Sequence, residues 1–398
     1  MAQALHPRES RFYELDILRG VAAIVVVIFH YKHFMLTRTA WGFDYLNMPF
    51  YRILMPVYVY GQFFVELFFS ISGYVFFWLY ADVINTRKTG TTAFFIARLA
   101  RLYPLYFATL ILVAILQWGF HSLYGKTFIY DHNSAGHFGL NLLMIQQWVP
   151  HPQFTFNGPA WSISVEVFLY VLFFLTCFLR LNRWWFLGLM VIGGLIYKYT
   201  RINPDADFLR GVPNFFLGGL VYYAVTALRV HEVWRKNLAR ALAVLVPLVW
   251  GLAYMRTTLA HWPMQHIPAD PDTLSPVLNV GGFVYVAIPL LLLWLGLQQG
   301  YWPKFVTREG LHKWSWIGDI SYSLYLIHFP LQLLIMLLVA QWPPEAQRQI
   351  FAQPLVFIGF MGVACGLAYL SFHAFEMPVR KIMRDGLMGI LARRKRIR

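Results

Sequence analysis

The stretch LDILRGVAAIVVVIFHY, residues 15–31, decides the fold class of this chain, because it is apolar apart from a few ionisable side chains. As a helix it is long enough to cross most of a membrane. Arg19 and His30 stand eleven residues apart, so a helix brings them within about 20° of one direction and separates them by about 16 Å. Ionisable groups at membrane depth are costly and usually face a protein interior or a water-filled path. We therefore expect this pair to mark a functional site.

Composition predicts an all-α, polytopic helical bundle integral to a membrane. Apolar residues make up 59% of the chain and charged residues only 13%, whereas soluble domains typically carry roughly 25% charged residues. Apolar runs predict about ten transmembrane helices. They lie near residues 15–35, 60–80, 102–119, 162–181, 184–200, 211–228, 241–256, 279–299, 316–339 and 353–375. The stretch 138–149 is too short and polar for a crossing, so we expect it to lie in the interface or to re-enter the bundle.

Positive charge predicts the orientation. With ten crossings and a cytoplasmic N-terminus, 24 of the 33 Lys and Arg residues fall in cytoplasmic segments. Since a Lys and Arg excess marks cytoplasmic loops, both termini are predicted to be cytoplasmic. The net charge of +15 is then mainly an orientation signal, and scattered basic residues argue against nucleic-acid binding. We expect one transmembrane domain over residues 1–380 and a basic cytoplasmic tail over 381–398 that can contact membrane lipids.

Five stretches, in order along the chain, resemble the signature segments of the membrane-bound acyltransferase 3 family. They are LDILRGVAAIVVVIFHY (15–31), FFVELFFSISGYVFF (63–77), FFIARLARLYPLYF (94–107), GPAWSISVEVFLY (158–170) and ISYSLYLIHFP (320–330), and FHAFEMPVRK (372–381) fits the usual ending. The resemblance implies an O-acyltransferase of the bacterial cytoplasmic (inner) membrane. It would move an acyl group, most often acetyl, from cytoplasmic acyl-CoA to a hydroxyl of a cell-envelope polysaccharide or lipid-linked glycan.

The resemblance also implies which partners to expect. Acetyl-CoA or another acyl-CoA serves as a donor substrate, and no cofactor is permanently bound. Some relatives carry an extra periplasmic domain of the SGNH type, which is not visible in this sequence. If transfer needs such a domain here, we expect a separate periplasmic transferase partner to supply it.

His30 and Glu166 are the candidate catalytic residues. Acyl transfer to a hydroxyl needs a base for the O–H proton, and a neutral imidazole can accept it. The structural alternative for His30 is a hydrogen bond to a neighbouring helix. Glu166 could orient His30 or bind sugar hydroxyls, or it could stabilise the N-terminus of a helix.

Arg19, Arg98 and Arg101 are the candidate acyl-CoA-binding residues. Arg98 and Arg101 are three apart, hence on one helical face, and guanidinium groups suit the phosphates of coenzyme A. Arginines at a cytoplasmic boundary are also expected for topology alone. Arg19 could contact the pyrophosphate or pantetheine part, or it could form an ion pair with Asp16 or Glu66.

The remaining candidates are acceptor contacts or structural supports. Trp161 could stack on a sugar face, and Ser164 belongs to the same Trp-Ser-x-Ser-x-Glu stretch. Tyr322 and His328 form a polar patch in an apolar helix, for which interhelical hydrogen bonding is the alternative to substrate contact. The spacing of the histidines in residues 120–160 matches no metal-binding pattern, so no metal site is predicted.

Composition alone leaves a second function class open. A polytopic transporter or flippase for a small molecule or lipid-linked glycan would also show buried charges and interrupted helices. A membrane glycosyltransferase is a third class, but no large soluble loop or metal-binding carboxylate pair supports it. Release of the acyl group from labelled acetyl-CoA would distinguish the acyltransferase from both.

Overall fold

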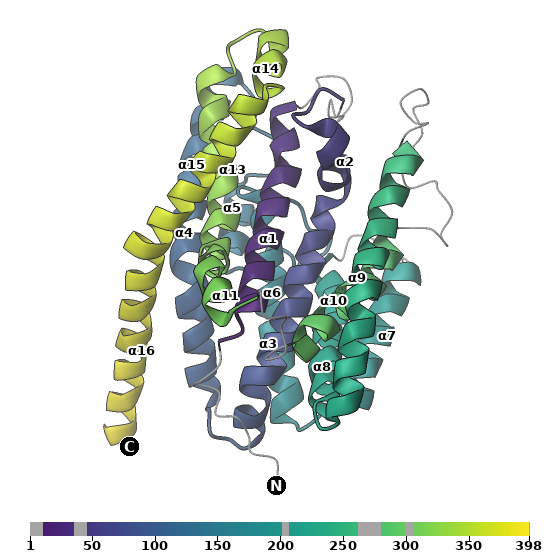
Figure 1. Cartoon of the computed structure of the whole chain (residues 1–398). Coiled ribbons are helices and arrows are strands. Elements are labelled where there is room, and N and C mark those ends of the chain that lie inside the picture. Colours follow the sequence, from purple (N-terminus) through teal and green to yellow (C-terminus); the bar gives the residue numbers. More distant parts are fainter. Residues whose placement is uncertain (1–10, 36–45, 201–206, 262–279, 299–305, 398) are drawn as a thin grey trace.

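The fold is a bundle of helices (Figure 1). The computed structural model describes residues 11–35, 46–200, 207–261, 280–298 and 306–397, and within these ranges every regular element is helical. The prediction of an all-α bundle is therefore confirmed for the described chain.

The long helices form the body of the bundle. They are α1 (Tyr13–His30), α3 (Phe64–Asn85), α4 (Thr91–Tyr124), α6 (Trp161–Phe178), α7 (Trp184–Thr200), α8 (Gly211–Leu228), α9 (Glu232–His261), α10 (Val280–Gln298), α13 (Ser321–Val339), α15 (Pro354–Ser371) and α16 (Met377–Ile397). Shorter elements connect them, namely η1 (Tyr31–Met35), α2 (Tyr51–Tyr60), η2 (Gly61–Phe63), α5 (Ala135–Leu142), η3 (Gly158–Ala160), η4 (Asp207–Arg210), α11 (Arg308–Trp314), α12 (Trp316–Asp319), α14 (Pro344–Phe351) and the π-helical turn η8 (Phe372–Glu376).

Seven helical stretches among the described residues are long and apolar enough to cross a membrane. They are Tyr51–Asn85, Thr91–Tyr124, Gly158–Phe178, Gly211–Leu228, Glu232–Met255, Arg308–Val339 and Pro354–Leu391. Three other predicted crossings correspond to α1, α7 and α10. The apolar parts of α7 and α10 are shorter, and α1 carries the charged residues Glu14, Asp16 and Arg19. The chain is a polytopic membrane protein, and the count of ten crossings stays a prediction.

The predicted spans differ from the helices mainly at their ends. The ranges predicted for α7 and α8 coincide with the structure, but α4 begins at Thr91, well before the predicted 102. A hydropathy window ends where polar residues begin, whereas the backbone hydrogen bonds of a helix continue through Arg98 and Arg101. Residues 138–149 hold the end of the eight-residue helix α5 and the turns that follow it, so this segment does not form a long crossing helix.

Several connections that the charge pattern assigned to the cytoplasm lie at one end of the bundle. In Figure 1 the turns α3–α4, α6–α7 and α8–α9 and the end of α16 all lie at the lower end. Arg87, in the first of these turns, donates a hydrogen bond to the carbonyl of Phe178 at 2.9 Å, which joins it to the second. Residues 381–397, predicted as a tail, continue α16. Which side of the membrane this end faces stays a prediction.

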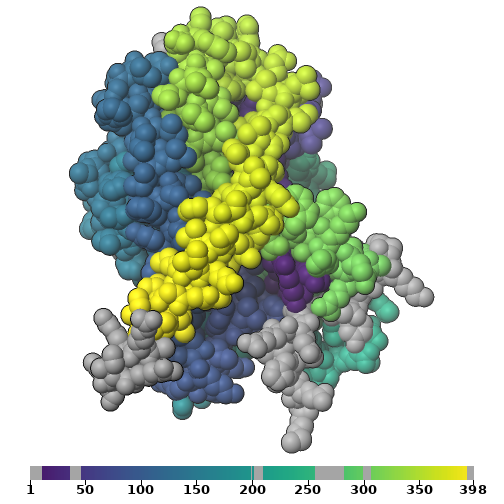
Figure 2. All heavy atoms as spheres, turned by 90° about the vertical axis from the view of Figure 1, so that its left-hand side faces the viewer, coloured from purple at the N-terminus to yellow at the C-terminus, as the bar shows by residue number. Residues whose placement is uncertain are grey.

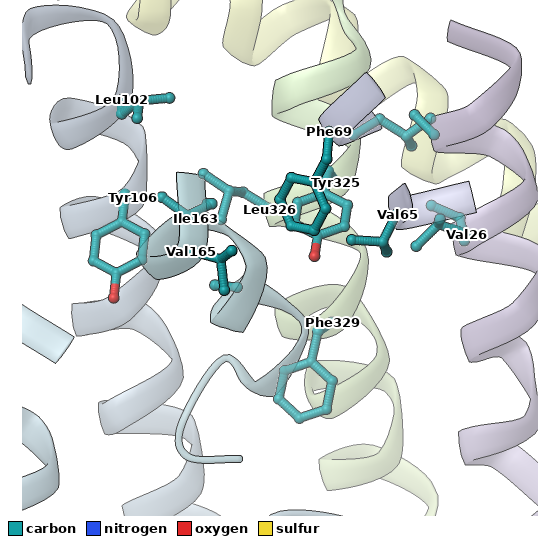
Figure 3. Packing of buried hydrophobic residues seen from close by; sticks show 14 of the residues in the cluster. Val26, Val65, Phe69, Leu102, Tyr106, Ile163, Val165, Tyr325, Leu326 and Phe329 are labelled. Carbon is teal, nitrogen blue, oxygen red and sulfur yellow. The ribbon is translucent and has the colours of Figure 1, made fainter. Parts of the chain in front are cut away.

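The centre of the bundle is packed with large apolar side chains from α1, α3, α4, α6 and α13. In Figure 3, Leu102 and Tyr106 reach this region from α4, Ile163 from α6, Phe329 from α13 and Val26 from α1. Figure 2 shows α15 and α16 crossing one face of the bundle diagonally. The apolar packing holds five helices in place around the polar groups described below.

Glycine allows α3 and α8 to approach each other closely. A Cβ atom at Gly73 would overlap the backbone oxygen of Phe215, and one at Gly218 would overlap that of Ser70. Small residues at such crossings are typical of membrane bundles, where close packing drives association.

We predict that Gly73→Ala lowers the free energy of unfolding by about 1–3 kcal/mol, because the backbone of Phe215 cannot move aside like a flexible side chain. Gly359→Ala is the matched control, since Gly359 is also helical and a Cβ there meets no atom within 4 Å. We expect it to be neutral or slightly stabilising. Thermal unfolding of the purified proteins measures both, and equal stability of the two variants would contradict the close approach.

Candidate active site

The two ionisable side chains of the first apolar helix both face the α12–α13 segment. Arg19 donates hydrogen bonds to the hydroxyl of Ser321 at 3.1 Å and to the carbonyl of Gly318 at 2.8 Å. Nearer the other end of α1, Nδ1 of His30 lies 3.2 Å from Nε2 of His328. Their rings stack, with centroids 4.9 Å apart and an interplanar angle of 27°. The structure thus places Arg19 and His30 on one face of α1, as their spacing predicted.

The hydrogen bond between the two imidazoles constrains where a proton can be accepted. One of the two facing nitrogens must carry hydrogen. If His30 donates from Nδ1, its Nε2 keeps a lone pair and can act as a base. If His328 donates instead, the Nδ1 lone pair of His30 is occupied and its Nε2 carries the hydrogen. Only the first arrangement leaves His30 free to accept a proton, and His328 then orients it in the manner of a catalytic base and its partner.

A cavity of about 100 Å³ lies between α1, α3, α4, α6 and α13. Its polar wall is formed by Arg19, Ser72, Arg101, Ser162, Glu166, Ser321, Tyr322 and Tyr325. Four residues predicted from the sequence therefore line one space. His30 and His328 are absent from the wall, and the wall residue Tyr325 has its ring centroid 6.0 Å from that of His328.

Glu166 is a cavity residue whose described partner is Tyr170. The hydroxyl of Tyr170 donates to its carboxylate, and the orientation of His30 by Glu166 stays a prediction. Because α6 begins at Trp161 and has no acidic residue in its first turn, stabilisation of the helix N-terminus does not explain Glu166. A carboxylate facing a cavity can instead compensate a cation or bind a hydroxyl.

The two arginines of the Arg-x-x-Arg segment have different surroundings. Arg101 lines the cavity and experiences the charges of Glu166 and Glu376. Arg98 is 8% exposed, donates to the hydroxyl of Tyr80 at 2.8 Å, and is absent from the cavity wall. The structure therefore separates the two predicted acyl-CoA contacts.

Glu376 and Arg380, which were not among the predicted site residues, join this electrostatic cluster. Glu376 accepts a hydrogen bond from Ser323 at 2.7 Å and acts electrostatically on Arg101, Arg380 and Arg19. It ends the π-helical turn η8, and such turns change the face that a helix presents and often occur at functional sites. The stretch FHAFEMPVRK (372–381) contains both residues. They were not selected, because charged residues at the end of an apolar helix are also expected at a cytoplasmic boundary.

Of the two acidic residues that were possible partners of Arg19, Asp16 forms an ion pair with it and Glu66 pairs with Arg210. Asp16 lies 2.6 Å from Arg11 and 3.4 Å from Arg19. Glu66, 1% exposed, accepts two hydrogen bonds from Arg210 at 2.9 and 2.7 Å. The Arg210 guanidinium also lies 5.3 Å from the ring of Trp161. Arg210 was not selected from the sequence, because an arginine directly before an apolar helix matches no motif by itself.

Ser164 has a structural environment. Its hydroxyl accepts from the backbone N–H of Gln147 at 3.2 Å, and its carbonyl accepts from the indole of Trp148 at 3.0 Å. It therefore fixes the turns after α5 to α6. Tyr322, by contrast, lines the cavity while its hydroxyl donates to the carbonyl of Leu102 at 2.6 Å.

His33 and Gln332 extend the histidine pair and were also missed. Gln332 donates to the carbonyl of His30 at 2.8 Å, and its side-chain oxygen lies 3.1 Å from Nδ1 of His33. The spacing in the sequence could have identified Gln332, because it follows His328 by four residues and therefore lies on the same face of the helix. In the described part of the chain, no group of three or more His, Cys, Asp or Glu side chains could hold a metal ion.

Comparison with known proteins gives a consistent picture. A family model described as an acyltransferase domain matches residues 12–373. The acyltransferase MdmB of Streptomyces mycarofaciens is 29% identical, over 81% of this chain and 79% of its own. The peptidoglycan O-acetyltransferase OatA of Listeria monocytogenes is 24% identical over 94% of this chain, and the O-acetyltransferase OatA of Staphylococcus aureus is 23% identical over 92%. The matched region spans 57% of each OatA protein. No solved structure gives a significant match.

We predict that Glu66→Leu lowers the free energy of unfolding by about 3 kcal/mol, because it leaves Arg210 without its main counter-charge inside the bundle. The double variant Glu66→Leu/Arg210→Leu should recover most of this loss. Denaturation of the single and double variants gives the coupling energy of the pair. Additive losses would show that the two side chains do not stabilise each other.

Proposed function

Because the chain belongs to the acyltransferase-domain family, we propose that it moves an acyl group, acetyl in the first instance, from cytoplasmic acyl-CoA to a hydroxyl of a cell-envelope polysaccharide or lipid-linked glycan. The observation that carries this proposal is the hydrogen-bonded pair His30–His328 beside a cavity whose wall bears Arg19 and Arg101. We place this activity in the bacterial cytoplasmic membrane. The family match favours it over the transporter or flippase alternative.

The charged wall of the cavity supports an anionic donor. Arg19 and Arg101 line it, and Arg380 experiences the charges of Arg101, Arg98 and Glu376. Guanidinium groups bind phosphate oxygens through charge-assisted hydrogen bonds. In this proposal the phosphates of acyl-CoA bind near Arg101, and the pantetheine arm extends along the cavity past Arg19. In this proposal the thioester reaches His30 past Tyr325, which lines the cavity and lies near His328.

The proposed reaction needs one base and no redox step. The acceptor oxygen attacks the thioester carbonyl carbon while Nε2 of His30 takes the hydroxyl proton. The new C–O bond forms, the C–S bond breaks, and the proton passes from His30 to the departing CoA thiolate. His328 accepts the Nδ1 hydrogen bond of His30 throughout, which keeps the ring oriented and stabilises the imidazolium.

The acceptor is proposed to approach from the end of the bundle opposite the α3–α4 turn. A hydroxyl of peptidoglycan is the acceptor that the name of the Listeria relative suggests, and a saccharide hydroxyl is the class that we propose here. Trp161, the first residue of α6, offers an indole for stacking on a sugar, although the guanidinium of Arg210 lies near its ring. A periplasmic partner chain, where transfer needs one, would receive the acyl group there.

We predict that His30→Ala abolishes acyl transfer while the protein still inserts and purifies normally. His328→Phe should lower the rate by roughly 100-fold, because His30 loses the partner that fixes its orientation. The measurement is release of CoA thiol from acetyl-CoA by the full chain in nanodiscs, with an envelope extract as acceptor. Full activity of His30→Ala would exclude it as the base.

A second prediction separates the two arginines. Arg101→Gln should weaken acetyl-CoA binding by about tenfold, the size of one lost charged hydrogen bond. Arg98→Gln, three residues away and also buried, should change it by less than about threefold, since Arg98 bonds to Tyr80 outside the cavity wall. Equilibrium binding of radiolabelled acetyl-CoA measures both. A larger effect at Arg98 would refute the assignment of the cavity to the donor.

A further inference from the structure

Gln332 bridges two segments of chain beside the histidine pair. It is fully buried and lies one turn beyond His328 on α13. Its Nε2 donates to the backbone carbonyl of His30 at 2.8 Å, and its Oε1 lies 3.1 Å from Nδ1 of His33. His30 is the last residue of α1, at the point where the 3-10 turn η1 begins. Gln332 binds its carbonyl from a different helix.

The chemistry of these bonds fixes the proton on His33. A backbone carbonyl can only accept, so the amide nitrogen of Gln332 must face His30. The amide oxygen then faces His33, and because this oxygen can also only accept, Nδ1 of His33 must carry a hydrogen. The orientation of the amide and the donor nitrogen of His33 therefore follow from the backbone of His30 and need no further assumption.

His33 is held rigidly in this position. Its side chain is 4% exposed, and its ring is perpendicular to the rings of Tyr130 and Phe329, at centroid distances of 5.9 Å from each. It belongs to the 3-10 turn η1, which continues directly from α1. Its ring centroid lies 5.1 Å from that of His30. The aromatic contacts fix His33, His33 fixes the Gln332 amide, and the amide holds the end of α1.

We propose that Gln332 and His33 are positioning residues for His30, acting as a clamp that holds the backbone of His30 so that its ring stays against His328. This inference rests on the proposed function, in which His30 is the base. Gln332 acts on His30 through the backbone carbonyl of His30, and His33 acts on it through the side chain of Gln332. In this clamp His33 contributes its Nδ1–H.

Four variants test this role. His33→Phe and Gln332→Leu remove the clamp, and each should lower kcat for CoA release from acetyl-CoA by roughly 10- to 100-fold, since small misplacements of a catalytic group have effects of this size. The KM for acetyl-CoA should not change, because the donor cavity is not involved. His33→Asn places an amide N–H near the position of Nδ1–H and should restore most of the rate. Gln332→Glu should not, because a carboxylate cannot donate to the carbonyl of His30.

Gln117→Leu is the matched control. Gln117 is 2% exposed and also makes two backbone hydrogen bonds, donating to the carbonyl of Phe128 at 2.9 Å and accepting from its N–H at 3.0 Å. If kcat falls only because a buried glutamine is lost, Gln117→Leu will lower it as much as Gln332→Leu. That result, or full activity of His33→Phe, would overturn the proposal. Equal losses in His33→Phe and His33→Asn would also overturn it, because they would make the imidazole itself essential.

Histidine ¹⁵N NMR of the labelled full chain separates this inference from the proposed function. The signal that disappears in His33→Asn should be that of an Nδ1-protonated imidazole, and Gln332→Leu should shift it. This result does not depend on activity. If His30→Ala keeps full activity, the proposed function fails while the NMR signal still reports the clamp. If the missing signal is that of an Nε2-only tautomer, the clamp fails whatever the activity.

Discussion

Gly318 packs against the backbone of Asp16, and Gly20 packs against Ile317, so that a Cβ atom at either glycine would overlap the opposite chain. This close approach of α1 to the α12–α13 segment determines the rest of the site. It lets Arg19 reach the carbonyl of Gly318 directly. Further along the same interface it allows His30 and His328 to stack. Lipid provides no hydrophobic drive for helix association, so close packing and interhelical hydrogen bonds hold such an interface together.

Pro330 adds a second constraint on α13. Because proline has no N–H, the carbonyl of Leu326 loses its helical partner, and Asn157 donates to that carbonyl at 3.1 Å instead. The segment that begins with Asn157 also contacts Tyr325. The hydroxyl of Tyr325 pairs with Ser162 at 2.7 Å and donates to the carbonyl of Pro159. The interrupted helix therefore ties the segment before α6 to the turn of α13 that carries His328. Pro330 thus leaves a free carbonyl on α13, and the segment before α6 binds to it.

The sequence predicts those features that depend on one helix at a time. Periodicity places Arg19 and His30 on one face, and hydropathy finds the apolar helices. Pairings between distant segments are not encoded in such patterns: His328 is 298 residues from His30, and Arg210 is 144 from Glu66. The Arg-x-x-Arg segment shows the limit within one helix. Three residues leave a rotation of about 60°, which is enough to place Arg101 at the cavity and Arg98 against Tyr80.

The burial of charge distinguishes structural groups from functional ones in this bundle. A charge that is only structural needs a fixed counter-charge, because the membrane interior cannot solvate it. Glu66 has one in Arg210, and Arg11 lies between Asp16 and Asp319. Arg101 and Glu166 differ, since both line the same cavity. The protein keeps them at membrane depth although apolar residues would pack the same volume more stably. Glu166 and Glu376 already act electrostatically on Arg101, and in the proposed function the phosphates of the donor would add to this compensation.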